Sequence, residues 1–214
     1  MVLLVKEDFR GAESKLFQKK WFDYPALYKV RFPKSYRIKE LDFQFRKTRT
    51  IHEARLLVKA KEAGVRTPII YEIDIHNTTL VLEYLGGEIL KTLLPKVSKK
   101  KMQEICEQLG EDVGKLHNAG IIHGDLTTSN IIKIPAEIQL AFIDFGLGYI
   151  SDRIEDVGID MFLLERAFRN THSTIFDNAW KSVIKGYKKT SIFGKDIESK
   201  LLEITSRGRY SERI

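Results

Sequence analysis

The chain has 214 residues, of which 43% are hydrophobic and 30% are charged, a composition typical of a globular protein and not of a disordered one. Its single cysteine, Cys106, excludes an internal disulfide, so a reducing, cytoplasmic location is expected. Residues 1–5 are too few for a signal sequence and no stretch has the length of a membrane span, so we expect no association with a membrane.

The net charge of +7 is distributed unevenly along the chain. Residues 1–70 carry 17 Lys and Arg against 8 Asp and Glu, residues 71–160 carry 8 against 15, and residues 161–214 carry 11 against 6. An acidic middle suits a metal site, and basic ends suit a polyanion such as RNA, whose phosphates attract such charge. A solvated basic surface without a partner explains the same numbers equally well.

The first part of the chain alternates apolar and charged residues with the period of β-strands, which predicts strands at residues 1–5, 14–22 and 26–32. Between the first two, Gly11 can bring backbone N–H groups close to a phosphate. A lone glycine is equally typical of an ordinary hairpin turn. On the third strand Lys29 has apolar neighbours and can reach a pair of nucleotide phosphates, with an exposed strand lysine as the alternative.

A helical period replaces the strand pattern at residues 41–63. Thr50 and Glu53 fit a capping box, in which a helix begins or restarts at Thr50 and Glu53 bonds only a backbone N–H. Alternatively, Glu53 points inward among apolar residues and forms an ion pair with Lys29, and we favour this interpretation. His52 is expected on the helix surface, because no Cys or second His lies at metal-binding spacing.

Two further strands are predicted at residues 69–75 and 79–84. The second runs into residues 82–87, an apolar segment that ends in two glycines. This segment is predicted to be a hinge between two lobes, with exposed backbone groups at Glu83 and Leu85 that can hydrogen-bond a purine. A strand end followed by a flexible loop is the plainer alternative.

The second half of the chain is predicted to be mostly helical. A long amphipathic helix covers residues 99–118, and Cys106 within it is expected to be a buried, unreactive thiol. The basic tail of residues 207–214 is expected to be mobile when free. The remaining predicted elements are short or moderate helices at residues 89–94, 160–170, 174–188 and 194–206, and a hairpin of residues 131–134 and 138–143.

Two short motifs carry the chemistry of the sequence: residues 123–130 read H-G-D-L-T-T-S-N and residues 144–146 read D-F-G. Phosphoryl transfer needs mainly positioned charge, namely a carboxylate near the attacking hydroxyl or water and ligands for Mg²⁺. Asp125 can supply the carboxylate. Asn130 and Asp144 are hard oxygen donors for a Mg²⁺ ion that also holds ATP phosphates. Each motif alone is a weak signal, but the two in this order predict a phosphotransferase.

Together these residues occur in the order found in protein kinases, and the chain resembles that fold over nearly its whole length. The resemblance implies an α+β, bilobal protein-kinase-like fold. Its parts would be a small β-rich N-lobe of residues 1–85 with one main helix, a reduced and mostly helical C-lobe of residues 86–206, and the basic tail of residues 207–214.

The same resemblance implies a role for each site residue. Lys29 would hold the α- and β-phosphates of ATP, and Glu53 would orient it. Asp125 would position or deprotonate the nucleophile. Asp160 would brace the catalytic loop, which is formed by residues 123–130. The ring of His123 would pack beneath that loop.

Three stretches narrow the resemblance, at residues 29–37 (KVRFPKSYR), 49–57 (RTIHEARLL) and 160–168 (DMFLLERAF). They resemble the small atypical kinase of the KEOPS complex, the PRPK family, in a form of archaeal size. This implies an atypical serine/threonine kinase and ATPase that uses ATP and Mg²⁺ and supports the threonylcarbamoyladenosine modification of tRNA.

The implied partners are the threonylcarbamoyltransferase subunit of KEOPS and another small KEOPS subunit, with tRNA reached through the complex and the basic tail. In the tail, Arg207, Arg209 and Arg213 would contribute to these interactions.

The chain departs from ordinary protein kinases in several places. Gly124 stands where they have an arginine, so a phosphorylated activation loop would lack its partner. Thr127 stands where many have a lysine that steadies the γ-phosphate, and Gly11 is all that remains of the glycine-rich loop. Only 14 positions separate Gly146 from Asp160, without an A-P-E sequence. These departures weaken peptide phosphorylation more than ATP binding.

Two alternatives remain open. Small-molecule kinases of the aminoglycoside or choline type also use an H-G-D motif, although they usually need helical insertions for which 214 residues leave little space. A nucleotide-binding scaffold without turnover is the other alternative, and an intact set of site residues argues against it.

Overall fold

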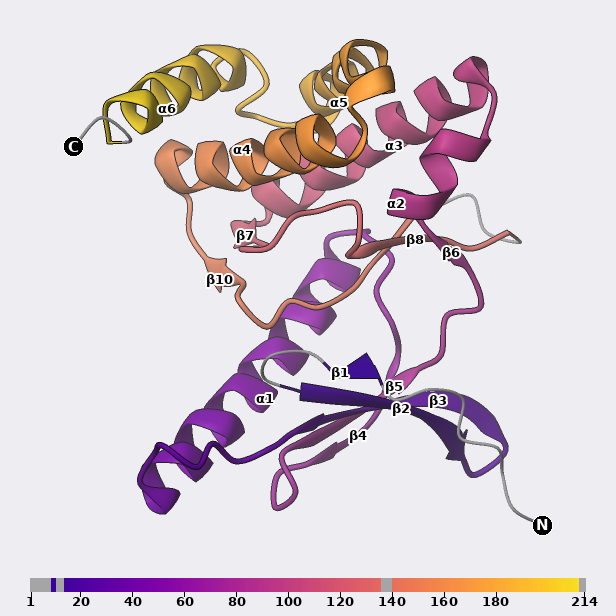
Figure 1. Cartoon of the computed structure of the whole chain (residues 1–214), viewed down its shortest axis with the longest axis vertical. Coiled ribbons are helices and arrows are strands. Elements are labelled where there is room, and N and C mark those ends of the chain that lie inside the picture. The colour runs from indigo at the N-terminus through magenta and orange to yellow at the C-terminus, as the bar shows by residue number, and fades with distance from the viewer. Residues whose placement is uncertain (1–8, 11–13, 136–139, 212–214) are drawn as a thin grey trace. The chain divides into compact units, whose positions relative to one another are not determined.

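The computed structural model describes residues 9–10, 14–135 and 140–211, so the strand predicted at residues 1–5 and the phosphate contact predicted at Gly11 lie outside the described residues (Figure 1). The described chain consists of two units. The first comprises Met1–Val58 and Pro68–Gly86, and the second comprises Lys59–Thr67 and Gly87–Ile214. Each unit is described by itself.

The first unit contains an antiparallel sheet with the strand order β1-β2-β3-β5-β4 and most of helix α1. On β3, Lys29 and Arg31 are two residues apart and are buried on one face, Ala26 is buried on the other face, and the two residues that begin the strand are exposed. The register places Lys29 opposite Leu16 on β2 and Leu80 on β5. The bounds are β1 Phe9–Arg10, β2 Ser14–Trp21, β3 Tyr24–Arg31, α1 Lys39–Glu62, β4 Ile70–Asp74 and β5 Thr79–Glu83.

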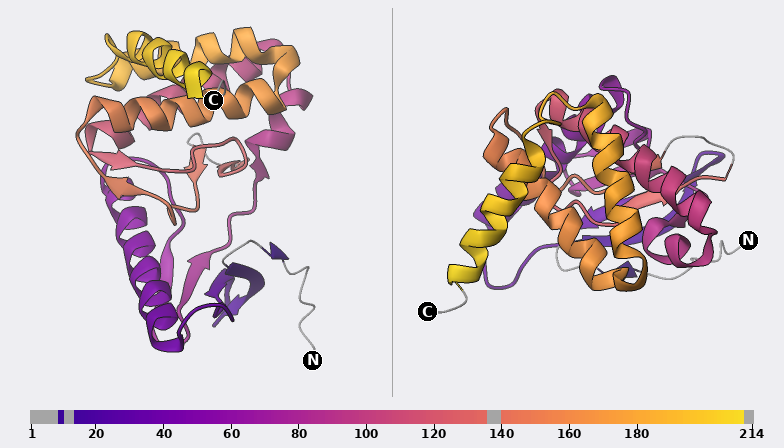
Figure 2. Two further views of the ribbon diagram at one scale, coloured as in Figure 1. Left: turned by 60° about the vertical axis from the view of Figure 1, so that its left-hand side comes forward. Right: turned by 90° about the horizontal axis from the view of Figure 1, so that it is seen from above.

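In the second unit, helix α3 packs against α5, and α6 packs against α4 (Figures 1 and 2). Two glycines allow α3 and α5 to approach closely: a Cβ atom on Gly110 would lie 2.0 Å from the carbonyl oxygen of Val183, and one on Gly186 would lie 1.9 Å from that of Glu107. The helices are α2 Leu90–Leu93, α3 Lys99–Asn118, α4 Ile154–Thr171, α5 Phe176–Thr190 and α6 Ile197–Ser211, with 3₁₀ turns at Leu94–Lys96 and Ser173–Ile175.

Short strands flank the two predicted catalytic motifs in the second unit. Strands β6, β8 and β9 form one antiparallel sheet, and β7 pairs with β10. The two motifs flank the β8–β9 hairpin, so the hairpin sets the distance between them. The bounds are β6 Glu88–Ile89, β7 Ile121–Ile122, β8 Ile131–Lys133, β9 Leu140–Phe142 and β10 Tyr149–Ile150.

Several predicted bounds differ from the observed ones. Helix α3 spans the predicted residues, but α4 begins at Ile154, six residues before its predicted start at residue 160. Helix α6 continues to Ser211, so residues 207–211, predicted as part of a mobile tail, extend a helix instead. The two-residue strands were not predicted, because two residues are too few to show a period. None of the described helices is both long enough and apolar enough to cross a membrane.

Candidate active site

In the first unit, Lys29 and Glu53 form a buried ion pair, with 2.7 Å between Nζ and Oε1. Glu53 is therefore directed inward from α1, as expected. Its second carboxylate oxygen accepts a hydrogen bond from Arg31, which is also buried. Glu53 thus holds two buried cations in place on β3, and a carboxylate between two donors has little freedom to turn.

Arg31 was missed as a site residue by the sequence reasoning. The signal that finds it is simple: it lies two residues beyond Lys29 on a strand, and side chains two residues apart share one face of a sheet. A carboxylate that pairs with Lys29 is therefore within reach of Arg31 as well.

The capping-box alternative for Thr50 is wrong. Helix α1 runs without interruption from Lys39 to Glu62, and the Thr50 hydroxyl donates to the carbonyl oxygen of Arg46 at 2.8 Å. This bond to the preceding turn is what a threonine forms inside a helix. The residue types of Thr50 and Glu53 fit a capping box, but both residues lie inside the helix and not at its start.

Glu83 and Leu85 lie at the end of β5 in the first unit. The Glu83 N–H donates to the carbonyl oxygen of Ile69 at 2.8 Å, and its carboxylate accepts from the Ile69 N–H at 2.9 Å. The Tyr84 N–H donates to Pro25 at 3.2 Å. Within the part of the chain that the structure describes, the backbone of Leu85 has no hydrogen-bond partner, so Leu85 can offer its backbone to a ligand and the Glu83 N–H cannot.

In the second unit, Asp125 and Asn130 form one hydrogen-bonded loop. The Asn130 side-chain nitrogen donates to the Asp125 carbonyl oxygen and to its carboxylate, both at 2.8 Å. Since both of these groups can only accept, the NH₂ end of the amide faces Asp125. The amide oxygen of Asn130 therefore points away from Asp125, as a ligand for a cation requires.

The hairpin between the motifs brings Asp144 to the same loop. The Ile143 N–H donates to the carbonyl oxygen of Asn130 at 3.0 Å, next to Asp144 in the chain. Asp144 has a φ of +61°, in the left-handed region, and its carboxylate accepts from the Gly146 N–H at 3.2 Å. Such a conformation costs a non-glycine residue about 1 kcal/mol or more and is concentrated at functional sites.

The donor set of Asn130 and Asp144 fits Mg²⁺ in the manner of phosphoryl-transfer enzymes. Mg²⁺ prefers oxygen ligands and is usually bound through one or two protein oxygens, with waters and substrate phosphates completing the shell. Among the described residues, no three or more His, Cys, Asp or Glu side chains are grouped as a metal site.

Asp160, on α4, binds the backbone at the start of the catalytic loop. Its carboxylate accepts from the backbone N–H groups of His123 at 2.8 Å and Gly124 at 2.9 Å, and lies 3.3 Å from Nε2 of His117. Burial opposes ionisation of this carboxyl, but the hydrogen bonds from the His117 ring and from the backbone N–H of His123 outweigh it and lower the pKa of Asp160. Asp160 is thus a positioning residue for the loop that carries Asp125.

The ring of His123 is buried beneath the loop, 4.6 Å from the ring of Phe145 between centroids, as predicted. Its Nε2 lies 3.1 Å from the carbonyl oxygen of Ile143, and its Nδ1 accepts from the Asp125 N–H at 3.3 Å. One nitrogen must donate and the other must accept, so the ring is the neutral Nε2–H tautomer. His123 thus connects the two motifs through its contacts with Ile143 and Asp125.

Gly124 replaces the usual arginine for a structural reason. Its φ is +78°, and a Cβ atom there would lie 2.3 Å from the carbonyl oxygen of Leu147. No L-residue with a side chain fits this position without moving the segment after the D-F-G motif. The segment therefore lies directly against the catalytic loop.

Thr128 fixes the middle of the catalytic loop to the end of α4, a contact that sequence reasoning also missed. Its hydroxyl is 3.1 Å from Nε2 of His172, and both side chains are buried. Burial, helped by the charge of Lys91, lowers the pKa of His172. Nothing in the spacing of Thr128 and His172 in the sequence signals this pair.

Comparisons with known proteins support the fold. The family model of the protein kinase domain matches residues 30–169. Among solved structures, WaaP in complex with acyl carrier protein has a TM-score of 0.62 at 14% identity, covering 96% of this chain and 89% of that one. The Rio2 kinase from Chaetomium thermophilum, in a complex with ADP, Mg²⁺ and phosphoaspartate, has a TM-score of 0.61 at 17% identity, covering 98% and 72%. The predicted α+β, protein-kinase-like fold is confirmed.

Other proteins are more similar in sequence to this chain than these two structures are. Over 212 residues the chain is 46% identical to the KEOPS complex subunit Bud32 of Pyrococcus abyssi, with 95% of this chain and 96% of the relative covered. It is 35% identical to the EKC/KEOPS complex subunit bud32 of Dictyostelium discoideum, with 94% and 81% covered.

A probable bifunctional tRNA threonylcarbamoyladenosine biosynthesis protein of Methanothermobacter thermautotrophicus is 41% identical over 203 residues, and the chain spans 36% of its length. The family predicted from three short stretches is thus confirmed. The chain belongs to the Bud32 family of KEOPS complex subunits, an atypical branch of the protein kinases.

Proposed function

We propose that this kinase acts in the cytoplasm as the ATP-dependent phosphotransferase and ATPase of a KEOPS complex, in the biosynthesis of threonylcarbamoyladenosine on tRNA. The observation that carries the proposal is the loop in which Asn130 is held by Asp125 next to Asp144, in a chain 46% identical to a KEOPS subunit along nearly its whole length. The similarity to KEOPS subunits supports the assignment of the complex and the pathway. The loop of Asp125 and Asn130 supports the assignment of the chemistry.

In this proposal Asn130 and Asp144 hold Mg²⁺, which neutralises charge on the phosphates of ATP. Lys29, oriented by Glu53, binds the α- and β-phosphates. The backbone of Leu85 binds the purine, beside Glu83, and Gly11 contributes a backbone contact to phosphate. The N-lobe, C-lobe and tail then correspond to residues 1–85, 86–206 and 207–214.

Asp125 orients and deprotonates the attacking group. Its carboxylate receives one hydrogen bond from Asn130 and its loop is held by Asp160, so its position is fixed before substrate arrives. The segment after the D-F-G motif lies against Gly124, where a bound peptide would have to displace it. Water is therefore favoured over a peptide hydroxyl as the acceptor, with autophosphorylation as a limited second activity.

We also propose the partners. The carbamoyltransferase subunit and a second small KEOPS subunit bind this chain, and Arg207, Arg209 and Arg213 contribute near the C-terminus. Arg207 pairs with Glu155 and Glu203, so it is placed by α4 and α6. Binding of the partner subunits through the three arginines would let the kinase respond to tRNA bound by the complex.

The test follows γ-labelled phosphate from Mg-ATP, first with the chain alone and then with the carbamoyltransferase and tRNA. Asp144→Ala is expected to lower phosphate release by at least about a hundredfold while the fold is kept, because it removes a ligand of the charge-neutralising ion. The matched control is Asp152→Ala, which removes an exposed carboxylate from the same segment and should change release less than about twofold.

The destination of the label separates the possible functions. Release as free phosphate, faster with partner and tRNA, supports the proposal. Transfer to a protein without that stimulation makes protein phosphorylation the main activity. Unchanged hydrolysis in Asp144→Ala contradicts the assignment of the site.

A further inference from the structure

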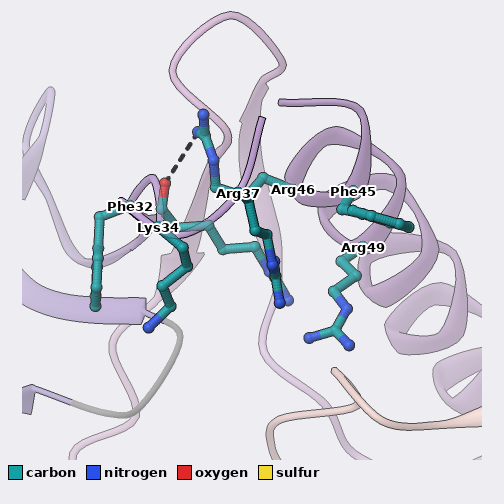
Figure 3. Close-up of a pocket in the computed structure, with 7 residues that line it drawn as sticks. Phe32, Lys34, Arg37, Phe45, Arg46 and Arg49 are labelled. Atoms are coloured by element: carbon teal, nitrogen blue, oxygen red, sulfur yellow. Dashed lines mark hydrogen bonds between the residues drawn. The ribbon is translucent and has the colours of Figure 1, made fainter. Parts of the chain in front are cut away.

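Within the described residues of the first unit, every buried polar side-chain atom has a hydrogen-bond partner. Arg46, which lines a small pocket beyond the end of β3 (Figure 3), donates to the carboxylate of Asp42 and to the hydroxyl of Thr78, both at 2.7 Å. In the described part of the second unit, two buried atoms have no partner: Oδ2 of Asp112 and Nδ1 of His172. An unsatisfied buried group lowers stability and often marks a place where another requirement outweighs that loss.

The ring of His172 is held firmly although one of its nitrogens has no partner. His172 follows the last residue of α4, is 2% exposed, and its N–H donates to the carbonyl oxygen of Phe168 at 2.8 Å. Its own carbonyl oxygen accepts from the Ile175 N–H at 3.0 Å, and its ring lies 5.4 Å from the Phe168 ring between centroids. These contacts fix the ring with Nε2 at the hydroxyl of Thr128.

The hydrogen bond between Thr128 and His172 leaves one group over. Burial and the charge of Lys91 lower the pKa of His172, so its ring is neutral at pH 7, with one donor nitrogen and one acceptor nitrogen. If Nε2 accepts from Thr128, Nδ1 is a donor without an acceptor, and if Nε2 donates, Nδ1 is an acceptor without a donor. Two apolar side chains of the same shape would avoid this loss, so stability does not explain the pair.

Thr128 is held by two elements at once. Its hydroxyl lies 3.1 Å from Nε2 of His172 at the end of α4, and its carbonyl oxygen accepts from the Lys91 N–H on α2 at 3.0 Å. Thr128 is 1% exposed, so neither bond competes with bulk water. The middle of the catalytic loop is therefore fixed relative to both helices.

Thr128 lies within the turn that places Asn130. The Asn130 N–H donates to the carbonyl oxygen of Thr127 at 3.1 Å, which closes the turn around Thr128. The side-chain nitrogen of Asn130 donates to Asp125, so the turn and Asp125 together direct the amide oxygen. A shift of Thr128 would move this oxygen, and Mg²⁺ tolerates little deviation from octahedral geometry.

We infer that His172 is a positioning residue for the metal site: through Thr128 it holds Asn130 where the amide oxygen binds Mg²⁺. The inference rests on the proposed function, because Asn130 is a metal ligand only in that proposal. Altering a residue that orients a metal ligand typically changes metal affinity by about 10- to 100-fold. The pair therefore contributes to the site although it lies outside it.

The test measures metal binding without turnover. Electron paramagnetic resonance of free Mn²⁺, an ion that takes the same oxygen ligands as Mg²⁺, gives its Kd in the presence of a non-hydrolysable ATP analogue. Thr128→Val keeps the shape and removes the hydroxyl, so it is expected to raise this Kd at least about fivefold. Thr128→Ser keeps the hydroxyl and should change the Kd less than about twofold. An unchanged Kd in Thr128→Val overturns the inference.

Thr190→Val is the matched control. The Thr190 hydroxyl donates to the carbonyl oxygen of Glu111 at 2.9 Å, so the substitution removes the same group from a contact between α5 and α3. It should change the Kd of Mn²⁺ less than about twofold. An equal rise in Thr128→Val and Thr190→Val would mean a general loosening of the second unit and would overturn the inference.

The double variant Thr128→Val with His172→Phe separates positioning from stability. It removes both partners and the unsatisfied nitrogen, so its thermal midpoint should be at least as high as that of Thr128→Val, which leaves both ring nitrogens unpartnered. The Kd of Mn²⁺ should nevertheless stay raised at least about fivefold. A Kd that recovers together with the thermal midpoint shows that the pair acts only through stability, and if the double variant does not fold, Thr128→Val decides.

Amide hydrogen exchange of the chain without ligands gives a measurement that does not depend on the proposed function. Thr128→Val should accelerate exchange of the Asn130 and Lys91 N–H groups at least about fivefold, because both are bonded within or to the turn around Thr128. If the unaltered chain binds no Mn²⁺ with the analogue, the proposed function fails, and exchange decides whether Thr128 positions Asn130. Unchanged exchange together with an unchanged Kd in Thr128→Val refutes the positioning role alone.

Discussion

At the scale of single residues, Glu53 is a strongly constrained side chain of the first unit. It is 1% exposed and its two oxygens serve different donors, Lys29 and Arg31. Two buried cations therefore share one carboxylate. The sharing of one carboxylate by two cations has a measurable consequence for stability, separate from any role in catalysis.

Glu53→Gln is expected to lower the free energy of unfolding by about 3 kcal/mol or more, because it removes the buried negative charge that both Lys29 and Arg31 contact. Lys29→Met should cost clearly less, since Arg31 still pairs with Glu53 and the new side chain is apolar. Urea unfolding followed by circular dichroism measures both. A larger loss in Lys29→Met than in Glu53→Gln contradicts the shared-carboxylate interpretation.

The sequence predicted the Lys29–Glu53 pair because both residues sit among apolar neighbours that force them inward. It did not predict how Gly124 and Asp144 are placed. Both have positive φ angles, which depend on how the chain is fitted between the catalytic loop and Leu147. Glycine at 124 was noticed only as a missing arginine, whereas the structure shows that no side chain fits there.

At the scale of elements, one buried network ties three helices to the catalytic loop. His117 on α3 lies 2.9 Å from the hydroxyl of Tyr187 on α5 and 3.3 Å from the carboxylate of Asp160 on α4. Asp160 in turn holds the backbone of His123. Burial raises the pKa of Tyr187, which therefore stays protonated and can donate to His117.

The network predicts a loss of stability in acid. The folded state lowers the pKa of Asp160 below its ordinary value of 3.8, so its stabilising contribution is complete above that value and is lost as the pH falls through the lowered pKa. Asp160→Asn should therefore reduce stability at pH 7 and reduce the acid-dependent part of the loss. Urea midpoints measured from pH 7 to pH 3 test this.

Asp112 on α3 provides a control, because its pKa is shifted in the opposite direction from that of Asp160. It is also buried in the second unit, but burial raises its pKa and one carboxylate oxygen has no partner among the described residues. Its ionised form therefore destabilises the fold as the pH rises above 3.8. Asp112→Asn should be neutral or stabilising at pH 7. A similar loss in both variants would mean that the packing, and not the charge, is affected.

The helices were easier to predict than the short strands for a physical reason. Helix α3 presents a buried stripe at helical spacing over 20 residues, and its predicted bounds are the observed ones. The start of α4 was missed because residues 154–159 include two acidic residues and a glycine, a composition that reads as a loop. Gly158 is needed there, since a Cβ atom would lie 2.5 Å from the side chain of Lys200 on α6.

At the scale of the whole molecule, the division into two units raises the question of whether they open separately. Helix α1 is shared, since its last residues, 59–62, group with the second unit. The ion cluster around Glu53 belongs to the first unit, and the Asp160 network belongs to the second. Parts of a protein with their own buried interactions open with their own free energies.

Cys106 reports the opening of the second unit. It is fully buried on α3, and burial raises its pKa to about 12, so at pH 8 only about one thiol in 10⁴ is ionised in the folded chain. Reaction with a thiol reagent in the folded state therefore requires opening around α3. The rate of labelling measures how often that occurs.

We expect Asp160→Asn to accelerate labelling of Cys106 about tenfold or more, because a loss of 1.4 kcal/mol in the second unit multiplies its open population by ten. Glu53→Gln should change the rate less than about twofold, although it lowers the stability of the first unit. Labelling with a chromogenic disulfide at pH 8, with the unfolded chain as reference, measures both rates. Equal acceleration by the two variants would show that the shared helix α1 makes both units open together, since opening in one would then carry the other with it.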